Sequence, residues 1–510
     1  MVRAIVAIAV TALSLAAAEV AFRIIDGYAI PSLLLQPARP TALTSPRTGK
    51  FDSTADVASY VDSLPVAAGV DRRWFTDAEL TRPTVVPDAD LRRRAERFTG
   101  QDALYINYEW NEQYLRRVVC HGTDSERAPF KAFDDVFVFD PTDGTEWPTF
   151  RFLRAVTYPD GLRTNAFGWR SQEIRLKHSS RTIRIAFVGA STTQGPHGGP
   201  YTYPELVGIW LNRWAESRHR GLVFETINAG REGINSRSIQ AVVTQEVMPV
   251  SPDFIVYYEG ANQMSPGDYL GPTTLPPRPR ESGPRPVRLA AYSDMAGRID
   301  RLLRRAVMPG DEPVKPILTV HWPADLDERD PDLTYPNLPV NLRQILADLE
   351  TIRRASEAGG SRLVMTSFMW LVYPGMVVDP VRDEYLFRYL NEVYWPFSYA
   401  HMRRFIDFQE RVFRKYAAAH KLEFIDFANE YPRDPRLFSD AIHMTWAGIR
   451  LQAWIVFNGL VPAIERAIAA GTLPRSGDGV PDTHPAFGPR RHLDVAAARA
   501  ACTLPLDKTK

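Results

Sequence analysis

The stretch Ile183-Arg184-Ile185-Ala186-Phe187-Val188, which runs directly into Gly189-Ala190-Ser191-Thr192-Thr193, decides the fold. Its first six residues are apolar except for Arg184, and such a run is typical of a strand buried on both faces of a parallel sheet. A turn of small residues follows. Because open α/β sheets bind ligands beyond the carboxyl ends of their strands, we expect Ser191 to lie at the ligand-binding edge.

Strand and helix patterns alternate around this stretch from about residue 181 to residue 460, which predicts βαβ units. We therefore predict an α/β fold, a three-layer sandwich with a central five-stranded parallel sheet. Pro462 should kink or break the last helix. Strands are expected at 183–189, 223–228, 253–258, 362–367 and 423–426, and helices at 202–217, 236–247, 342–358, 400–419 and from about 445.

Two further motifs lie at the ends of expected elements, far from Ser191 in the chain. Gly260-Ala261-Asn262-Gln263 follows the third strand, and Asp440-Ala441-Ile442-His443 precedes the last helix. Each motif alone has an ordinary structural explanation, such as a tight turn, a turn cap or a surface ion pair. Serine, Asp and His together, however, supply a nucleophile, an orienting carboxylate and a base. The three motifs jointly predict a serine esterase.

Other catalytic and binding motifs do not fit the chain. Thr193 stands where the G-x-S-x-G elbow of α/β-hydrolases has its second glycine, and no G-K-[ST] follows to make a phosphate-binding loop. No H-E-x-x-H pattern occurs, so we expect neither a metal nor a cofactor. A net charge of +1 over 510 residues argues against a nucleic-acid partner.

The motifs resemble the sequence blocks of the SGNH (GDSL-type) hydrolases over about residues 181–263 and 340–460. Asn165-Ala166-Phe167-Gly168-Trp169-Arg170 also resembles a lead-in of exported bacterial members. The resemblance implies an SGNH/flavodoxin-like sheet and an acyl-enzyme mechanism. It also implies the site residues: Ser191 as nucleophile, Asp440 and His443 as its partners, and Gly233 and Asn262 as oxyanion donors, with Gly230 as the alternative to Gly233.

Two positions depart from the pattern of the family. Ala190 replaces the Asp of the first block, and Gln263 replaces the Asp that follows Asn262. Neither position holds the nucleophile, the base or an oxyanion donor. The departures therefore weaken a lipase-like assignment more than they weaken hydrolysis.

The first residues predict export. Arg3 is followed by an apolar run from Ala4 to Ala18 that ends in a small-residue cleavage pattern, as in a signal peptide. The apolar pattern continues to Ile25, and residues 4–22 are almost long enough for an uncleaved membrane anchor if Glu19 lies near the membrane interface. Cleaved and anchored forms both stay open, and a buried helix of a cytosolic protein is the third alternative. Export would place the protein in the periplasm or anchored facing the envelope.

Composition suggests the remaining boundaries. A Pro-rich insertion is expected at about 264–338, and its basic part around Arg298 fits either an anionic membrane surface or a solvated helix face. The expected divisions are residues 1–30 as signal peptide or membrane anchor, 31–175 as tether and accessory region, 176–470 as hydrolase domain, and 471–510 as a loosely held tail.

Three details allow two explanations each. His197 either touches substrate or lies in a solvated loop. Aromatic residues crowd the stretch 368–399, where they either line a pocket for sugar rings and short acyl chains or pack in the core. Cys120 and Cys502 either form one disulfide or remain separate buried thiols.

Three functions follow from these residues. The first is an exported deacylase that removes O-acetyl or short acyl groups from a carbohydrate or small ester through an acyl-Ser191 intermediate. The second is an O-acyltransferase that passes the same acyl group to an envelope polysaccharide. The third is a non-catalytic envelope scaffold, against which the complete set of Ser191, Asn262, Asp440 and His443 argues.

Overall fold

The structure, a computed structural model, describes residues 2–26, 54–77, 164–165, 167–174, 179–195, 201–218, 221–270, 293, 295–299, 302, 315–376, 378 and 384–475. The tether, most of the accessory region, His197, Cys120 and Cys502 lie outside these residues, and the expectations about them stay predictions.

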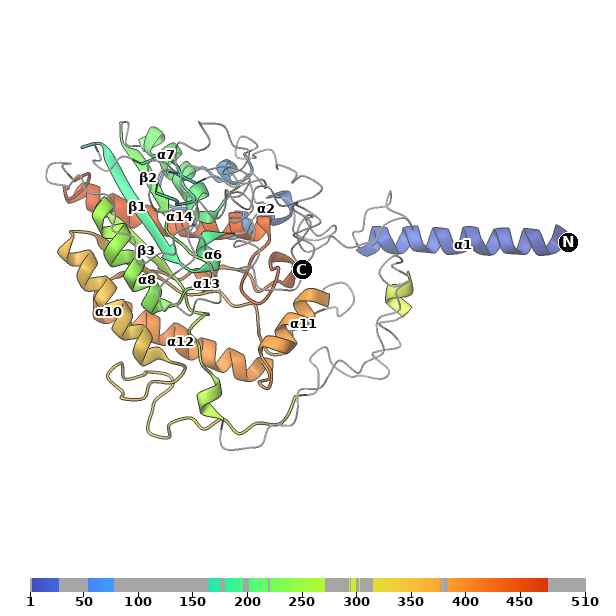
Figure 1. Ribbon diagram of the computed structural model, residues 1–510. Helices are drawn as coiled ribbons and strands as arrows, with labels where there is room; N and C mark the ends of the chain where they lie inside the picture. Colours follow the sequence, from blue (N-terminus) through green and yellow to red (C-terminus); the bar gives the residue numbers. More distant parts are fainter. Residues whose placement is uncertain are drawn as a thin grey trace, which may run out of the picture.

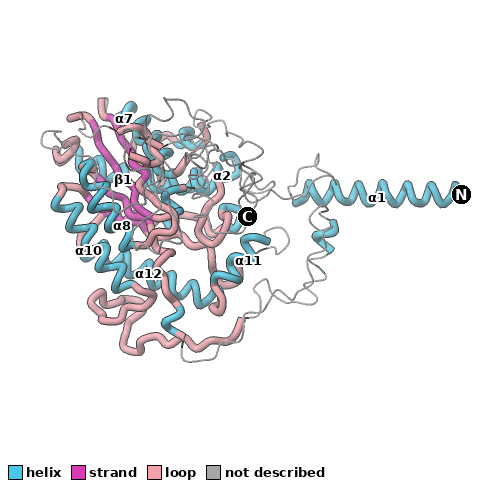
Figure 2. Tube along the Cα trace, viewed as in Figure 1, coloured by secondary structure: helices cyan, strands magenta, loops and turns pink. Residues whose placement is uncertain are grey.

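A five-stranded parallel sheet forms the centre of the molecule, which confirms the predicted fold class (Figures 1 and 2). The strand order is β2-β1-β3-β4-β5. Gly189 at the end of β1 pairs with Tyr258 at the end of β3, so the turns after these two strands leave the sheet side by side. The strands are β1 (Thr182–Gly189), β2 (Val223–Asn228), β3 (Phe254–Tyr258), β4 (Arg362–Thr366) and β5 (Glu423–Ile425).

Helices cover both faces of the sheet and complete the three layers (Figure 1). Helices α7 and α14 pack against each other on one face, and α8, α10 and α12 lie on the other. The described helices are α1 (Val2–Asp26), α2 (Thr54–Ser63), α6 (Ser191–Gln194), α7 (Tyr203–Arg218), α8 (Ser236–Val242), α10 (Leu342–Ala358), α11 (Glu384–Val393), α12 (Tyr399–Ala419), α13 (Phe427–Glu430) and α14 (Trp446–Ala469), with short helical turns at η2 (Arg72–Phe75), η4 (Val243–Val247), η5 (Met248–Val250), η6 (Gly267–Tyr269) and η8 (Pro435–Leu437).

Two helices differ from the sequence expectation. The helix expected at 236–247 is regular only to Val242, after which η4 continues it with the wider π-helical hydrogen-bond pattern. Pro462 does not end α14, which runs on to Ala469. The lost backbone hydrogen bond is tolerated because Val461, Ala463 and Ile464 are buried on either side of the proline and packing holds the helix together.

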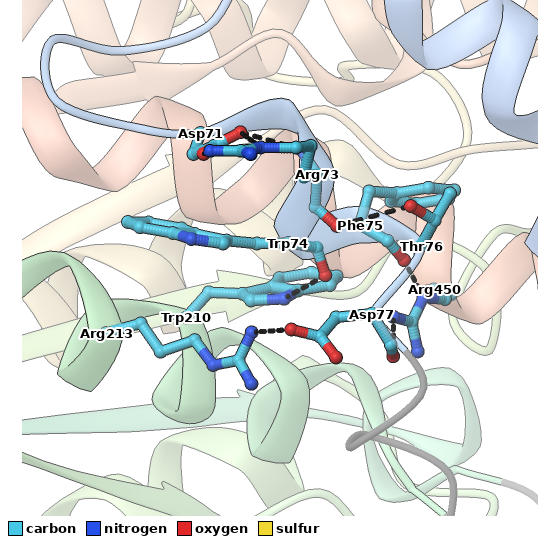
Figure 3. Close-up of polar contacts among 9 residues, drawn as sticks. All are labelled: Asp71, Arg73, Trp74, Phe75, Thr76, Asp77, Trp210, Arg213 and Arg450. Carbon is cyan, nitrogen blue, oxygen red and sulfur yellow. Dashed lines mark hydrogen bonds and ion pairs between the residues drawn. The ribbon is translucent and has the colours of Figure 1, made fainter.

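Residues 54–77 pack into the core of the sheet-based domain, although they precede β1 by about a hundred residues, and Figure 3 shows the contacts of their last part, residues 71–77. Phe75 is fully buried, with its ring centroid 6.3 Å from that of Trp210 on α7. The indole N–H of Trp210 donates to the carbonyl of Trp74 at 3.2 Å, and the Arg450 guanidinium of α14 donates to the carbonyl of Phe75 at 2.5 Å. The segment therefore joins α7 to α14.

The ends of the insertion and of the tail are tied to the domain. Leu270 and Val320, both inside the insertion expected at about 264–338, form an antiparallel bridge. Arg475 donates from Nε to Asp253 Oδ1 at 2.6 Å and from a terminal nitrogen to the carbonyl of Pro252 at 2.6 Å. The expectation of a loosely held tail is therefore wrong for its first residues, up to Arg475, because Arg475 binds them to the start of β3.

Helix α1 projects away from the body of the protein (Figure 1). Two described helices are long and apolar enough to cross a membrane, by length and composition alone. One is α14, which is 83% buried inside the protein and forms part of its core. The other is Val6–Arg23 within α1, with a mean hydropathy of 1.7 and only 11% burial. The expected signal or anchor segment is thus helical and largely uncovered by protein.

Candidate active site

Ser191 stands at the carboxyl edge of the sheet, as the sequence predicts. It is the first residue of the short helix α6, directly after β1, so its backbone N–H has no acceptor within the helix. The turn is possible only because Gly189 lacks a side chain: a Cβ there would lie 2.2 Å from both Thr193 Oγ1 and the carbonyl oxygen of Tyr258. Ser191 itself is 8% exposed.

His443 joins Ser191 to Asp440 across the active site. Its Nε2 lies 2.7 Å from Ser191 Oγ, and its Nδ1 lies 2.7 Å from Asp440 Oδ2. The Nδ1–H tautomer therefore lets the ring donate to the carboxylate and accept the serine proton. The His443 side chain is 35% exposed, whereas that of Asp440 is 9% exposed. The base can reach substrate while its orienting carboxylate is shielded from water.

The turn from Asp440 to His443 fixes the orientation of its own carboxylate. Asp440 Oδ1 accepts the backbone N–H groups of Ile442 at 2.9 Å and His443 at 2.8 Å, which leaves Oδ2 for the imidazole. Burial alone would raise the pKa of Asp440, but the charge and hydrogen bonds of His443 hold it below its ordinary value.

The same surroundings raise the pKa of His443 above its ordinary value. Burial alone would lower the pKa of His443, but the Asp440 carboxylate raises it to about 9. The carboxylates of Glu232 and Glu259 add to this effect. The site is therefore built to stabilise an imidazolium, the form His443 takes when it has accepted the serine proton.

Of the two glycines in the second block, the geometry favours Gly233 as an oxyanion donor. The N–H of Gly230 already donates to Asn228 Oδ1 at 3.1 Å, and a Cβ at Gly230 would lie 2.4 Å from the Gln194 nitrogen. Gly230 is thus a close-packing glycine. Gly233 is exposed, has a φ of +66°, and its N–H donates to no residue that the structure describes.

Gly233 is positioned from both sides by contacts to the other blocks. The Arg231 N–H donates to the carbonyl of Gly189 at 3.2 Å. On the other side, Asn262 Nδ2 donates to the carbonyl of Ile234 at 2.8 Å. The amide group of Asn262 has a second N–H, and the side chain is exposed. The three sequence-predicted oxyanion donors, Ser191, Gly233 and Asn262, therefore belong to one set of contacting turns.

The sequence analysis missed Glu259, the residue immediately after β3. This carboxyl is 2% exposed, and its Oε1 accepts the N–H groups of Ala261 at 2.7 Å and Asn262 at 2.9 Å. Burial raises the pKa of Glu259 to about 7. A carboxyl at the end of an otherwise apolar strand was the available signal. Glu259 shapes the turn that carries Asn262.

Gln263, where the family pattern has Asp, joins the turn after β3 to the start of α8. Its Oε1 accepts the N–H of Ser236, at the start of α8, at 2.5 Å. A glutamine carbonyl can accept this bond as a carboxylate would, although without a charge. Ala190 is 1% exposed and makes no side-chain cap for α6. Both departures are therefore accommodated without removing a group from the Ser191–His443–Asp440 relay.

The aromatic stretch after β4 is mostly core. Phe368 stacks on Tyr258 with ring centroids 4.8 Å apart, and Trp370 and Tyr394 are 5% and 3% exposed. The stretch is nevertheless tied to the catalytic turn, because the Leu371 N–H donates to the carbonyl of Ala441 at 2.9 Å. Partly exposed aromatic residues that could meet a substrate are Tyr373, Phe387 and Tyr389.

The chain resembles known proteins only distantly. No protein-family model and no curated protein matches the chain. The solved acetylxylan esterase Axe2 of Geobacillus stearothermophilus is 14% identical and aligns over 56% of this chain and 96% of its own, with a TM-score of 0.30. A GDSL-like lipase of Bacteroides thetaiotaomicron is 13% identical over 56% of this chain and 88% of its own, with a TM-score of 0.27.

A third solved structure, the α/β hydrolase LAE5 from the metagenome of Lake Arreo in Spain, is 13% identical. It aligns over 56% of this chain and 98% of its own, with a TM-score of 0.29. The solved structures that the chain resembles thus bear the names of esterases, lipases and hydrolases. At such low identities and TM-scores this likeness does not assign a function to the chain.

Proposed function

We propose that the protein is a serine esterase of the SGNH type, which removes O-acetyl or short acyl groups from a carbohydrate or small ester. The observation that carries the proposal is the relay of two 2.7 Å contacts, from Ser191 Oγ to His443 Nε2 and from His443 Nδ1 to Asp440 Oδ2. A serine hydroxyl is a weak nucleophile until such a base accepts its proton. The blocks of sequence that bring these residues together resemble those of SGNH hydrolases.

In the first step, Ser191 Oγ attacks the ester carbonyl and its proton passes to His443 Nε2. The carbonyl oxygen becomes negatively charged, and the N–H groups of Ser191, Gly233 and Asn262 are the donors available to bind it. Removing one such donor commonly raises the barrier by about 2.7–4 kcal/mol. Collapse of this intermediate breaks the ester bond, and the leaving alcohol takes the proton from His443. An acyl-Ser191 remains.

In the second step, water replaces the alcohol. His443 accepts a proton from the water, which attacks the acyl carbonyl, and the same donors bind the second oxyanion. The serine oxygen leaves and recovers its proton from His443, so that the net reaction is hydrolysis of one ester bond. Because Asp440 stabilises the imidazolium in both steps, no other charged group has to move.

The proposed substrate class rests on weaker support than the chemistry. The resemblance is to exported hydrolases, and aromatic faces suit sugar rings and short acyl chains. Tyr373, Phe387 and Tyr389 are partly exposed on the stretch that Leu371 ties to the catalytic turn. We therefore propose an acylated glycan or a small acetyl ester as the substrate.

Labelling with a fluorophosphonate probe, followed by peptide mass spectrometry, tests the proposal. We expect modification at Ser191 and its loss in Ser191→Ala and His443→Ala, with melting temperatures close to that of the parent protein. Ser217→Ala, which changes an exposed serine on α7, is the matched control and should label normally. Absence of labelling in folded parent protein would reject the esterase and favour a scaffold.

Acetylated glycans, incubated with and without acceptor sugars, then test the direction of acyl transfer. Free acetate in both reactions is the expected result for an esterase. If acetate appears on the acceptor and its release into water falls, the same acyl-enzyme serves an O-acyltransferase.

A further inference from the structure

The apolar part of α1 is exposed on the protein. Ile8 and Leu13 are 70% and 71% exposed, and Val6 is 54% exposed. A helix that is apolar on every side is ordinarily buried in a core or in a membrane. From residue 4 to residue 18 it spans about 22 Å at 1.5 Å per residue. This length approaches the roughly 30 Å of a bilayer's hydrocarbon core.

Buried polar contacts begin at Glu19, directly after this apolar part. Glu19 and Arg23 are 5% and 1% exposed and form an ion pair at 2.7 Å. The other carboxylate oxygen of Glu19 accepts the Ser293 hydroxyl at 2.7 Å and the Met295 N–H at 3.0 Å. One carboxylate thus connects the end of α1 to a segment of the insertion more than 270 residues away in the chain.

The insertion segment that meets α1 carries basic and apolar groups together. We call residues 293, 295–299 and 302 the collar. The Arg298 guanidinium lies 4.6 Å from the centroid of the Phe22 ring, a second contact with α1. Ile299 and Leu302 are 50% and 66% exposed beside it. An apolar and basic segment of this kind suits the headgroup region of an anionic bilayer.

We propose that α1 is an uncleaved anchor that crosses a lipid bilayer, and that Glu19 fastens the collar to it at headgroup level. The peptide bond between Ala18 and Glu19 lies inside α1, next to a buried side chain. A protease that binds extended backbone would have to unwind the helix and break the Glu19 contacts before it could cut there. The proposal does not depend on the esterase activity, since Ser191 takes no part in it.

Fluorescence quenching in vesicles tests the position of the collar. The full-length chain, with Cys120→Ser and Cys502→Ser, carries an environment-sensitive dye at Leu302→Cys and is reconstituted into phosphatidylcholine–phosphatidylglycerol vesicles that contain a nitroxide-headgroup lipid. We expect quenching at Leu302. The same dye at Val223→Cys, half exposed at the start of β2, is the control and should not be quenched. Equal quenching at both sites would overturn the proposal.

The Glu19 contact is tested in the same vesicles. Glu19→Ala should lose the quenching at Leu302, because Ser293 and Met295 lose their common acceptor, while the chain stays in the membrane through α1. Glu216→Ala, an exposed glutamate on α7, should change nothing. Unchanged quenching in Glu19→Ala would show that this carboxylate does not hold the collar.

Intact mass and oligomeric state test the anchor itself. Protein extracted from membranes of the producing cell should retain residues 2–18, whereas a chain that begins at Glu19 would overturn the proposal. If the apolar face of α1 were instead covered by a second copy of the chain, detergent-free protein would be a soluble dimer that ignores vesicles. That outcome would also reject the bilayer as the partner.

Discussion

His443 determines the pH at which Ser191 can be activated. The base must be neutral to accept the serine proton, and its pKa is raised to about 9, chiefly by Asp440 against the opposing effect of burial. As the pH rises through about 9, the neutral fraction of His443 grows. We therefore expect kcat/KM for a neutral soluble ester to increase with pH up to about 9. A profile that is flat from neutral to alkaline pH would contradict this assignment.

Asp440→Asn separates the two roles of the carboxylate. The amide has no charge, so burial should dominate and the pKa of His443 should fall, which moves the rising limb of the pH profile to lower pH. The rate itself should drop by about 10⁴, as it does in other triads when the imidazole loses its orienting acceptor. If Asp440→Asn is slow but the rising limb of its pH–rate profile does not move, a group other than His443 controls that profile.

Glu259 is a positioning residue, and substitution can separate the hydrogen bonds that its side chain accepts from the ionisation of its carboxyl group. Its Oε1 accepts both N–H groups of the Asn262 turn, and Glu259→Gln retains an Oε1 that can do the same. We expect Glu259→Gln to keep kcat within a few-fold. Glu259→Ala leaves the Ala261 and Asn262 N–H groups without their acceptor, and displacement of the Asn262 amide should reduce kcat by up to about 10².

Stability against pH gives a second measurement on Glu259→Gln. The pKa of Glu259 in the folded protein is about 7, above its ordinary 4.5, so the fold favours the protonated form. Its contribution to stability is present below about pH 4.5 and is lost as the pH rises through about 7. The melting temperature of Glu259→Gln relative to the parent should therefore increase from pH 5 to pH 8. A constant difference would contradict the raised pKa.

The sequence predicts the proposed catalytic residues better than the residues that position them. Ser191, Asn262, Asp440 and His443 stand in short motifs at element ends, so chain order suggested that they meet. Glu259 has no such motif, because its importance comes from burial and from hydrogen bonds that only the folded turn provides. The choice between Gly230 and Gly233 likewise depended on which N–H was already used.

At the scale of elements, strands were predictable and long-range contacts were not. The apolar runs of β1 and β3 are short local patterns that predict buried strands, and both strands are buried. Residues 54–77 carry no comparable local pattern, since their partners on α7 and α14 lie more than 130 residues away. Pro462 is a similar case: a local rule predicted a kink or a break, and the helix does not end there because tertiary packing holds it together.

The 54–77 segment should be essential for stability although it contains none of the proposed catalytic residues. Phe75 is fully buried between Trp210 and Trp454. Phe75→Ala should lower the free energy of unfolding by about 3–5 kcal/mol, measured by denaturant titration. The control is Phe424→Ala on β5, where the ring is partly exposed and the loss should be clearly smaller. A loss at Phe75→Ala as small as that expected at Phe424→Ala would contradict the role of residues 54–77 in stability.

For the whole molecule, we propose that catalysis and membrane attachment are carried by different parts of one chain. The relay of Ser191, His443 and Asp440 lies within the sheet-based domain, whereas α1 projects from it and contacts the collar (Figure 1). Activity on a dissolved ester should therefore be independent of α1. Activity on a substrate in the same membrane should benefit from the high local concentration that tethering creates.

Removal of residues 1–30 tests this division. The shortened chain should be soluble, with a melting temperature and a kcat/KM for a dissolved ester close to those of the parent, because no contact between the Ser191 relay and α1 is found among the residues that the structure describes. Its rate on an acylated glycolipid embedded in vesicles should fall by about tenfold or more, since each encounter then starts from solution. Loss of activity on the dissolved ester would show that α1 supports the fold. Equal activity on the embedded substrate would show that the anchor does not bring the active site to the membrane surface, and the substrate would then have to be sought in solution.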